Sequence, residues 1–212
     1  MTTIALFGGT GKTGRRVLAR ALEQGYDVRA LVRDPEKLGG TLPASLTVIQ
    51  GDVRDPSAVA QTIAGSNAVL SLFGQVKGSP KTLQADGTRN IVAAMQKHGV
   101  RRIVTLSGGG LRAEGKDQPT AADKIIRFLL KAISGHVLAD AEEHLRVLQE
   151  SSTEWTVVRG PRLMETPGTG SYRVGWVGVN SSTQIGRDDL AEFILSQVDD
   201  RTFIRELPFV SN

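Results

Sequence analysis

A cluster of glycines follows the first apolar segment of the chain and could bind phosphate. Gly8, Gly11 and Gly14 fit the pattern G-x-x-G-x-x-G, and a second pattern, G-x-G-x-x-G, begins at the next residue. Glycines at this spacing allow a sharp turn and a close approach of backbone to phosphate, and the N–H groups that open the following helix attract negative charge. We therefore expect a pyrophosphate to contact the residues Gly8, Thr10, Gly11, Lys12, Thr13 and Gly14.

The same loop also imitates the end of a P-loop, G-x-x-x-x-G-K-[ST], at Gly11-Lys12-Thr13. A P-loop requires a glycine five positions before Gly11, and Leu6 stands there. The later apolar segments Leu70–Phe73 and Val104–Ser107 also lack an aspartate suited to hold magnesium. The sequence therefore argues against a nucleotide hydrolase.

The second apolar segment ends at Arg33, whose planar guanidinium suits bidentate contact with a phosphate on a ribose 2′-oxygen. Lys37 adds positive charge one turn later. An acidic residue at this place is typical of binding to free ribose hydroxyls, and Asp34 could take that role. Alternatively, Asp34 caps the short helix that begins at Pro35. The pattern favours NADP(H) over NAD(H) as the bound dinucleotide.

Three further segment ends carry residues that fit the rest of a dinucleotide. The carboxylate of Asp52 could accept a hydrogen bond from an adenine amino group, or it could serve a turn. Phe73 and Gly74 end another apolar segment, where glycine lets the backbone pass close to a ribose. Ser107 is the candidate catalytic group, as a hydrogen-bond donor or as the holder of a proton-bearing water; the alternative is a hydroxyl satisfied by backbone.

Short β-like runs alternate with helical stretches, which predicts a doubly wound α/β fold with a mainly parallel sheet of about seven strands and helices on both faces. The strands expected in the first half are Thr3–Phe7, Val28–Val32, Leu46–Ile49, Ala68–Phe73 and Arg102–Leu106. The helices expected between them are Lys12–Gln24, Pro56–Ala64 and Leu83–His98. Because the carboxyl ends of parallel strands meet at one edge of a sheet, the candidate residues should come together there.

The pattern becomes irregular after Ser107. The elements expected there are helices at Ala121–Ile133, Val137–Glu150 and Asp188–Val198, strands at Trp155–Val158 and Phe203–Leu207, and a hairpin arm at Val174–Val179. The apolar side of the first helix is expected in the core, with a pocket wall or a dimer interface as alternatives. One domain over residues 1–212 is expected, with insertions at about 107–150 and 160–186 that form the substrate side.

Asp140 and His144 are spaced to share one face of a helix and could form an acid–base pair. The favoured interpretation is a solvated face, because charged residues surround them in sequence. The other two histidines, His98 and His136, are expected to be structural.

The composition is that of an ordinary globular protein. The 212 residues are 40% hydrophobic and 23% charged, and the modest net charge of +4 with 5% aromatic residues does not indicate a nucleic-acid partner. There are no cysteines and only three histidines, so no metal site is expected. No apolar run reaches the roughly 20 residues of a membrane span, and no basic segment opens the N-terminus, so a cytoplasmic protein without a membrane partner is expected.

Six segments together carry a family resemblance: Gly8–Gly14, Ala30–Leu38, Gly51–Asp55, Gly87–Gly99, Arg102–Ser107 and Thr153–Leu163. They resemble the atypical short-chain dehydrogenases/reductases, in the NAD(P)H-binding group that includes biliverdin reductase B/flavin reductase and the NmrA-like proteins. The resemblance implies a seven-stranded Rossmann-type sheet with NADP(H) in its cleft. The positions it implies for the cofactor are the adenine at Asp52 and Val53, the ribose at Phe73 and Gly74, and the nicotinamide near Ser107 and Pro161.

The chain departs from standard short-chain dehydrogenases at the catalytic pair Y-x-x-x-K. The only tyrosines are Tyr26 and Tyr172, and neither has a lysine four residues later. Without that pair, oxidation of ordinary alcohols by a tyrosine proton relay is not expected.

Hydride transfer to a planar acceptor requires chiefly placement and stacking, which the chain could supply without a tyrosine base. The predicted function is therefore an NADPH-dependent reductase acting on a flavin, a quinone or a similar planar acceptor. The alternative is an NmrA-like redox sensor that binds NADP without turnover and docks a protein partner through residues 107–150. A monomer or a weak homodimer is expected in either case.

Overall fold

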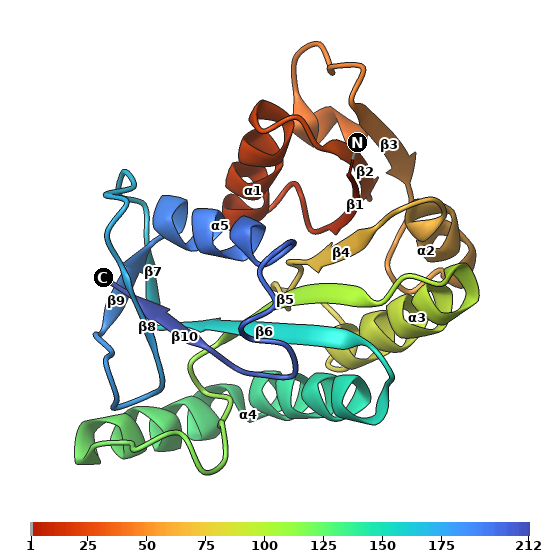
Figure 1. Ribbon diagram of the computed structural model, residues 1–212. Coiled ribbons are helices and arrows are strands. Elements are labelled where there is room, and N and C mark those ends of the chain that lie inside the picture. Colours follow the sequence, from red (N-terminus) through yellow and green to blue (C-terminus); the bar gives the residue numbers. More distant parts are fainter. Residues whose placement is uncertain (1) are drawn as a thin grey trace.

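The computed structural model describes residues 2–212, and a sheet of eight strands forms its centre (Figure 1). The strand order is β3-β2-β1-β4-β5-β6-β10-β8, and only β8 runs antiparallel to its neighbour in this sheet. The strands are β1 (Thr3–Phe7), β2 (Asp27–Val32), β3 (Leu46–Gln50), β4 (Ala68–Ser71), β5 (Arg102–Gly108), β6 (Glu154–Gly160), β10 (Phe209–Ser211) and β8 (Arg173–Gly175). The predicted Rossmann-type α/β class is confirmed, with the antiparallel edge strand β8 as an addition to the parallel strands.

Helices cover both faces of the sheet (Figure 1). The helices α1 (Lys12–Glu23) and α5 (Arg187–Ser196) pack on one face, and α2 (Pro56–Ile63), α3 (Leu83–His98) and α4 (Ala121–Glu150) pack on the other. In β1, Ile4 and Leu6 are buried with the first pair of helices, whereas Ala5 and Phe7 are buried with the second group. Burial on both faces explains why the central strands read as continuous apolar runs rather than as alternating ones.

The two helices predicted on either side of Gly135 form the single element α4, which is kinked where Ser134 leaves helical geometry (φ −136°, ψ 40°). The kink lies one residue before the predicted break. In the half of α4 that precedes the kink, Ile125 is 61% and Phe128 is 71% exposed. The expectation that this half packs into the core is therefore wrong for Ile125, Ile126 and Leu129, whose side chains remain exposed to solvent. The side chains of Leu130 and Ile133 lie outside the description.

The prediction of a last strand at Phe203–Leu207 is wrong. Arg205 adopts a left-handed conformation (φ 61°), which a strand cannot contain, and the segment is a turn followed by an isolated bridge from Glu206 to Thr156. The side chains alternate here as in a strand, but the strand that joins the sheet is β10, which pairs with β6 at Phe209 and Arg159.

A second, two-stranded sheet lies beside the main one. It pairs β7 (Arg162–Met164) in parallel with β9 (Gln184–Gly186), and neither strand was expected. The predicted hairpin arm at Val174–Val179 corresponds in part to β8 and to the bridge between Trp176 and Val179.

Within residues 2–212, no helix combines the length and the apolar character needed to cross a lipid bilayer. The same residues contain no group of three or more His, Cys, Asp or Glu side chains arranged to hold a metal ion.

Candidate active site

The segment between β1 and α1 is a tight glycine turn, which we call the phosphate loop (residues 8–14). Gly8 has a φ of +85°, and a Cβ there would lie 2.7 Å from the backbone of Leu72 and Phe73. A Cβ at Gly14 would lie 2.1 Å from the carbonyl oxygen of Gly8. A Cβ at Gly9 would meet only the side chain of Leu6, at 3.0 Å. The structure therefore makes Gly8 and Gly14 the sterically required glycines, so G-x-x-G-x-x-G is the pattern that fits the backbone.

The phosphate loop leaves the N-terminus of α1 open to an anion. Gly11 precedes the helix, and no side chain caps it. The first N–H groups of α1 thus lack the partner that a capping residue supplies, and they carry the positive end of the helix dipole.

Two predicted phosphate contacts in α1 are engaged with a distant segment. The Nζ of Lys12 lies 3.1 Å from a carboxylate oxygen of Glu165. The hydroxyl of Thr13 accepts a hydrogen bond of 2.8 Å from Arg187, which also donates to Glu165. These contacts attach the chain beyond β6 to the start of α1.

A cavity of about 90 Å³, the nucleotide cavity, lies against the phosphate loop. It brings together seven of the predicted cofactor residues: Gly8, Thr10, Arg33, Asp52, Val53, Phe73 and Gly74. They come from the ends of β1, β2, β3 and β4, which is the edge where the topology of a doubly wound sheet collects ligand contacts.

Arg33 is exposed at the rim of the nucleotide cavity, and its guanidinium makes no hydrogen bond or ion pair within residues 2–212. Lys37 does not line this cavity: its Nζ lies 3.4 Å from the carboxylate of Asp34. Asp34 stands at the N-cap position of the short 3₁₀ helix Pro35–Leu38, but its side chain does not cap it. Arg15, which the sequence analysis missed, donates to the carbonyls of Thr10 and Lys37 and ties the phosphate loop to the chain after β2.

Asp52 is held in an ionised, fixed position beside the nucleotide cavity. Its carboxylate accepts hydrogen bonds of 2.9 Å from both the backbone N–H and the Nε of Arg54. The side-chain hydrogen bond from Arg54 is the main reason that the pKa of Asp52 lies below its usual range. Asp52 therefore serves a turn while it also lines the cavity.

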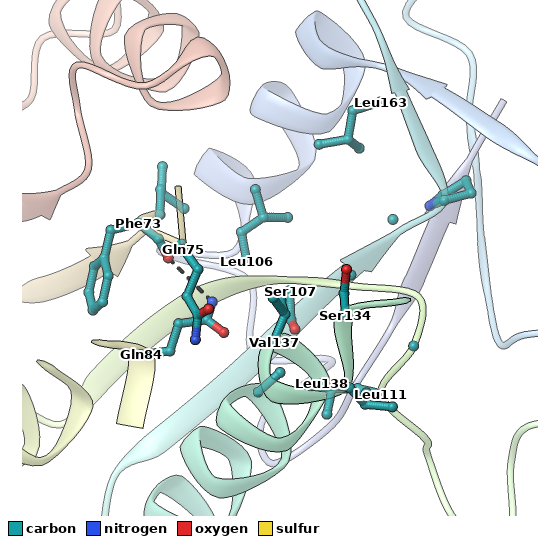
Figure 2. A pocket seen from close by; sticks show the side chains of 17 residues that line it. Phe73, Gln75, Gln84, Leu106, Ser107, Leu111, Ser134, Val137, Leu138 and Leu163 are labelled. Atoms are coloured by element: carbon teal, nitrogen blue, oxygen red, sulfur yellow. Dashed lines mark hydrogen bonds between the residues drawn. The ribbon is translucent and has the colours of Figure 1, made fainter. Parts of the chain in front are cut away.

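A larger cavity of about 360 Å³, the apolar cavity, adjoins the nucleotide cavity and shares Phe73 and Gly74 with it. Figure 2 shows Leu106, Leu111, Val137, Leu138 and Leu163 around it, with Ser107 among them. The side chain of Ser107 comes from the end of β5, and Ser107 is 8% exposed. Within the described residues its hydroxyl has no hydrogen-bond partner, so the alternative of a hydroxyl satisfied by backbone does not hold. Pro161 also lines this cavity.

Gln75 and Gln84 add polar groups to the wall of the apolar cavity near Phe73 (Figure 2). The amide of Gln75 donates to a carboxylate oxygen of Asp140 at 2.6 Å, and that of Gln84 donates to the carbonyl of Phe73 at 3.4 Å. Neither glutamine could be predicted as a site residue from the sequence, since no motif marks them.

Asp140 and His144 lie on the buried side of α4, so the expectation of a solvated face is wrong for both. Asp140 is 4% exposed, and its carboxylate accepts hydrogen bonds of 2.9 Å from the backbone N–H groups of Gln84 and Ala85 at the start of α3. His144 lies between the hydroxyls of Thr88, at 2.6 Å, and Thr105, at 3.2 Å. Burial lowers the pKa of His144 to about 4, so the imidazole is neutral near pH 7.

A buried ion pair lies next to Leu111 and Gly160, which line the apolar cavity. Arg159, at the end of β6, donates to both carboxylate oxygens of Asp117 at 2.8 and 2.9 Å, and the two side chains are 0% and 4% exposed. Arg159 also donates to the carbonyls of Leu111 and Leu207. Burial opposes ionisation of Asp117, but hydrogen bonds from Arg159 and from backbone N–H groups outweigh it, and the pKa of Asp117 lies below its usual range.

The geometry agrees with the family to which the chain belongs. Residues 8–201 match the NAD(P)H-binding family, and the protein is a member of that family. Among curated proteins, a chloroplastic protein of Arabidopsis thaliana is 29% identical over 195 residues, covering 87% of this chain and 68% of that protein. A Mycobacterium tuberculosis protein is 35% identical over 106 residues, but only 12% of its length is covered.

Solved structures share the fold over the whole chain. A short-chain dehydrogenase/reductase of Veillonella parvula in complex with NADP has a TM-score of 0.79 at 20% identity, with 100% of this chain and 94% of that chain covered. ChuY of Escherichia coli O157:H7, described as an anaerobillin reductase, has a TM-score of 0.76 at 19% identity, with coverages of 99% and 97%. The chain is thus a Rossmann-type NAD(P)H-binding protein.

Proposed function

We propose that this protein is an NADPH-dependent reductase that transfers hydride to a flavin, a quinone or a similar planar acceptor. The observation that carries the proposal is that the two cavities adjoin: the apolar cavity shares Phe73 and Gly74 with the nucleotide cavity, and Ser107 lines it. An apolar slot of about 360 Å³ suits a planar ring system, which stacking and exclusion of water can place against the cofactor.

Each part of the dinucleotide has residues that fit it. The phosphate loop and the open N-terminus of α1 would hold the pyrophosphate, Arg33 the 2′-phosphate, and Asp52 with Val53 the adenine. Phe73 and Gly74 would line the ribose. When bound, NADPH supplies the hydride.

The preference for NADP(H) rests on the free guanidinium of Arg33. In this reading Lys37 contributes less, because its amino group is already paired with Asp34. The NADP seen with the Veillonella parvula relative supports the same assignment by analogy.

Ser107 is the proposed catalytic residue. Its hydroxyl enters the apolar cavity without a partner among the described residues, so it is available to hydrogen-bond an acceptor oxygen or nitrogen, or to hold the water that delivers the proton. The proton held at Ser107 would complete the reduction of the acceptor by the hydride that bound NADPH would supply. Segments 107–150 and 160–186, which supply Ser107, Leu138 and Leu163, form the acceptor side.

The alternative, a redox sensor that binds NADP without turnover, is favoured by one observation. The first half of α4 presents Ile125, Phe128 and Leu129 to solvent, where a protein partner could cover them. The named activity of ChuY, a structural neighbour, favours the reductase instead.

The test is NADPH oxidation with and without FMN, riboflavin and a panel of small quinones, after NADPH binding has been confirmed by a thermal shift. We expect acceptor-dependent oxidation, and a loss of about tenfold in kcat in Ser107→Ala, the size expected for one lost hydrogen bond. Ser134→Ala is the matched control, since it removes a hydroxyl from the same cavity on α4. NADPH binding without any acceptor-dependent oxidation would overturn the reductase and leave the sensor.

A further inference from the structure

A third cavity of about 440 Å³, the arginine cavity, borders the apolar cavity. The two share the backbone at Gly108, Gly110 and Gly160, together with Pro161. A ligand that occupies the apolar cavity can therefore extend past the ends of β5 and β6 into the arginine cavity. The walls of this cavity differ from those of its neighbour, because Arg112, Arg127 and Arg162 all line it.

Two of these three guanidinium groups have no partner. Arg112 and Arg162 make no side-chain hydrogen bond and no ion pair within residues 2–212. Arg127 differs, because it donates to the carbonyl of Gly110 and pairs with Glu142 at 2.9 Å. Asp123 also lines this cavity, but its carboxylate accepts hydrogen bonds from the backbone N–H and the hydroxyl of Thr120 at the start of α4.

Free guanidinium groups are uncommon in this chain. Within the described part of the chain, only Arg33, Arg112, Arg162 and Arg173 lack both an ion pair and a side-chain hydrogen bond. Arg33 lies at the nucleotide cavity, where an anion is expected, and Arg112 and Arg162 lie together at the arginine cavity. Arg173 lies on the edge strand β8 and lines neither cavity.

We propose that the acceptor carries an anionic group, a phosphate or a carboxylate, on a tail that Arg112 and Arg162 bind in the arginine cavity. Guanidinium groups form charge-assisted, often bidentate, hydrogen bonds with both kinds of group. The apolar residues Ile126, Val177 and Phe209 would contact the tail between the ring and the charge. This inference rests on the proposed function, since it deepens the identity of the acceptor.

FMN and riboflavin test the inference, because they share one ring system and differ by a single phosphate. Binding of each is measured by flavin fluorescence with the protein saturated with NADP⁺, so that the nucleotide cavity is occupied. We expect FMN to bind at least tenfold more tightly than riboflavin. The double variant Arg112→Gln/Arg162→Gln should remove this difference while it leaves riboflavin affinity and NADPH affinity unchanged.

Arg173→Gln is the matched control, because it removes an equally free guanidinium outside the cavity, and it should retain the preference for FMN. Equal affinities of the wild-type protein for FMN and riboflavin, or a preference for FMN that survives the double variant, would overturn the anionic subsite. Those results leave reductase activity itself intact. Failure of the proposed function has a different signature: flavin binds with the expected preference, but no acceptor oxidises NADPH.

Discussion

The phosphate loop and the acceptor side are held in place by different kinds of interaction. In the phosphate loop, the N–H of Gly11 donates to the carbonyl of Gly8 at 3.0 Å, and Gly8 packs against the backbone beyond β4. On the acceptor side, buried side-chain charges connect segments far apart in the chain, as Arg159 and Asp117 do across 42 residues. The first region depends on backbone geometry, and the second depends on buried polar contacts.

Two other buried carboxylates also connect segments that lie far apart in the chain. Asp140 accepts from the first N–H groups of α3, and Asp189, at the start of α5, accepts from the N–H groups of Thr169 and Gly170. In each case a buried acidic side chain fixes a distant backbone segment. The acceptor side should therefore be sensitive to charge changes and to pH, whereas the phosphate loop should be sensitive to side-chain volume.

The largest expected effect is on stability, in Asp117→Ala. Removing the carboxylate leaves the guanidinium of Arg159 buried and uncompensated, which costs about 3–5 kcal/mol in the free energy of unfolding. Urea unfolding measures this cost. The control Glu142→Ala breaks the partly exposed pair with Arg127, and it should cost less than about 1 kcal/mol. Equal costs in the two variants would contradict the distinction between buried and exposed charges.

The next largest expected effect is a pH dependence of the free energy of unfolding, caused by His144. Its pKa is about 4 in the folded protein and 6.5 in the unfolded chain, so the unfolded state binds the extra proton as the pH falls. The free energy of unfolding is therefore not reduced by His144 above pH 6.5. It falls between pH 6.5 and about 4, by on the order of 3 kcal/mol in total.

Urea unfolding at a series of pH values checks this pH dependence. His144→Gln should show a shallower decline than the wild-type protein over that interval, because the variant lacks the titrating ring. Parallel curves would show that His144 does not carry the dependence.

In the phosphate loop, the expected effect comes from added side-chain volume rather than from a change of charge. Gly8→Ala places a Cβ 2.7 Å from backbone atoms at a positive φ, whereas Gly9→Ala meets only the movable side chain of Leu6. We expect Gly8→Ala to lose about 1–3 kcal/mol through overpacking, and Gly9→Ala to lose clearly less. Thermal unfolding and NADPH titration measure the two variants. Equal losses would favour the pattern that begins at Gly9.

The smallest effect should be one of specificity, in Arg33→Ala. Loss of a charge-assisted contact to the 2′-phosphate should weaken NADPH binding by about 10–100-fold and leave NADH binding nearly unchanged. Calorimetric titration with both dinucleotides measures this. Lys37→Ala serves as the control, with a smaller effect, because Lys37 pairs with Asp34. Equal losses for NADPH and NADH would contradict the assignment of Arg33.

Element boundaries could be predicted from the sequence where a short stretch of chain determines its own conformation. Pro56 after the capping residue Asp55 begins α2, and Gly99, in the left-handed region, ends α3, as predicted. The prediction failed where the side chains alternate as in a strand but the backbone does not extend, as at Arg205. The prediction also failed for the first half of α4, where Ile125, Phe128 and Leu129 are exposed to solvent.

The sequence by itself determined the order of strands and helices as far as β6, the phosphate loop and the position of Arg33, because glycine spacing and strand ends are local properties. The tertiary structure decided which charges are buried: neither the pairing of Arg159 with Asp117 nor the contact of His144 with Thr88, 56 residues away, has a local signal. It also decided that the apolar and arginine cavities adjoin, since both form only when β5, β6 and α4 pack together. Long-range packing sets the local dielectric and therefore the charge state of these groups, and spacing along the chain cannot reveal it.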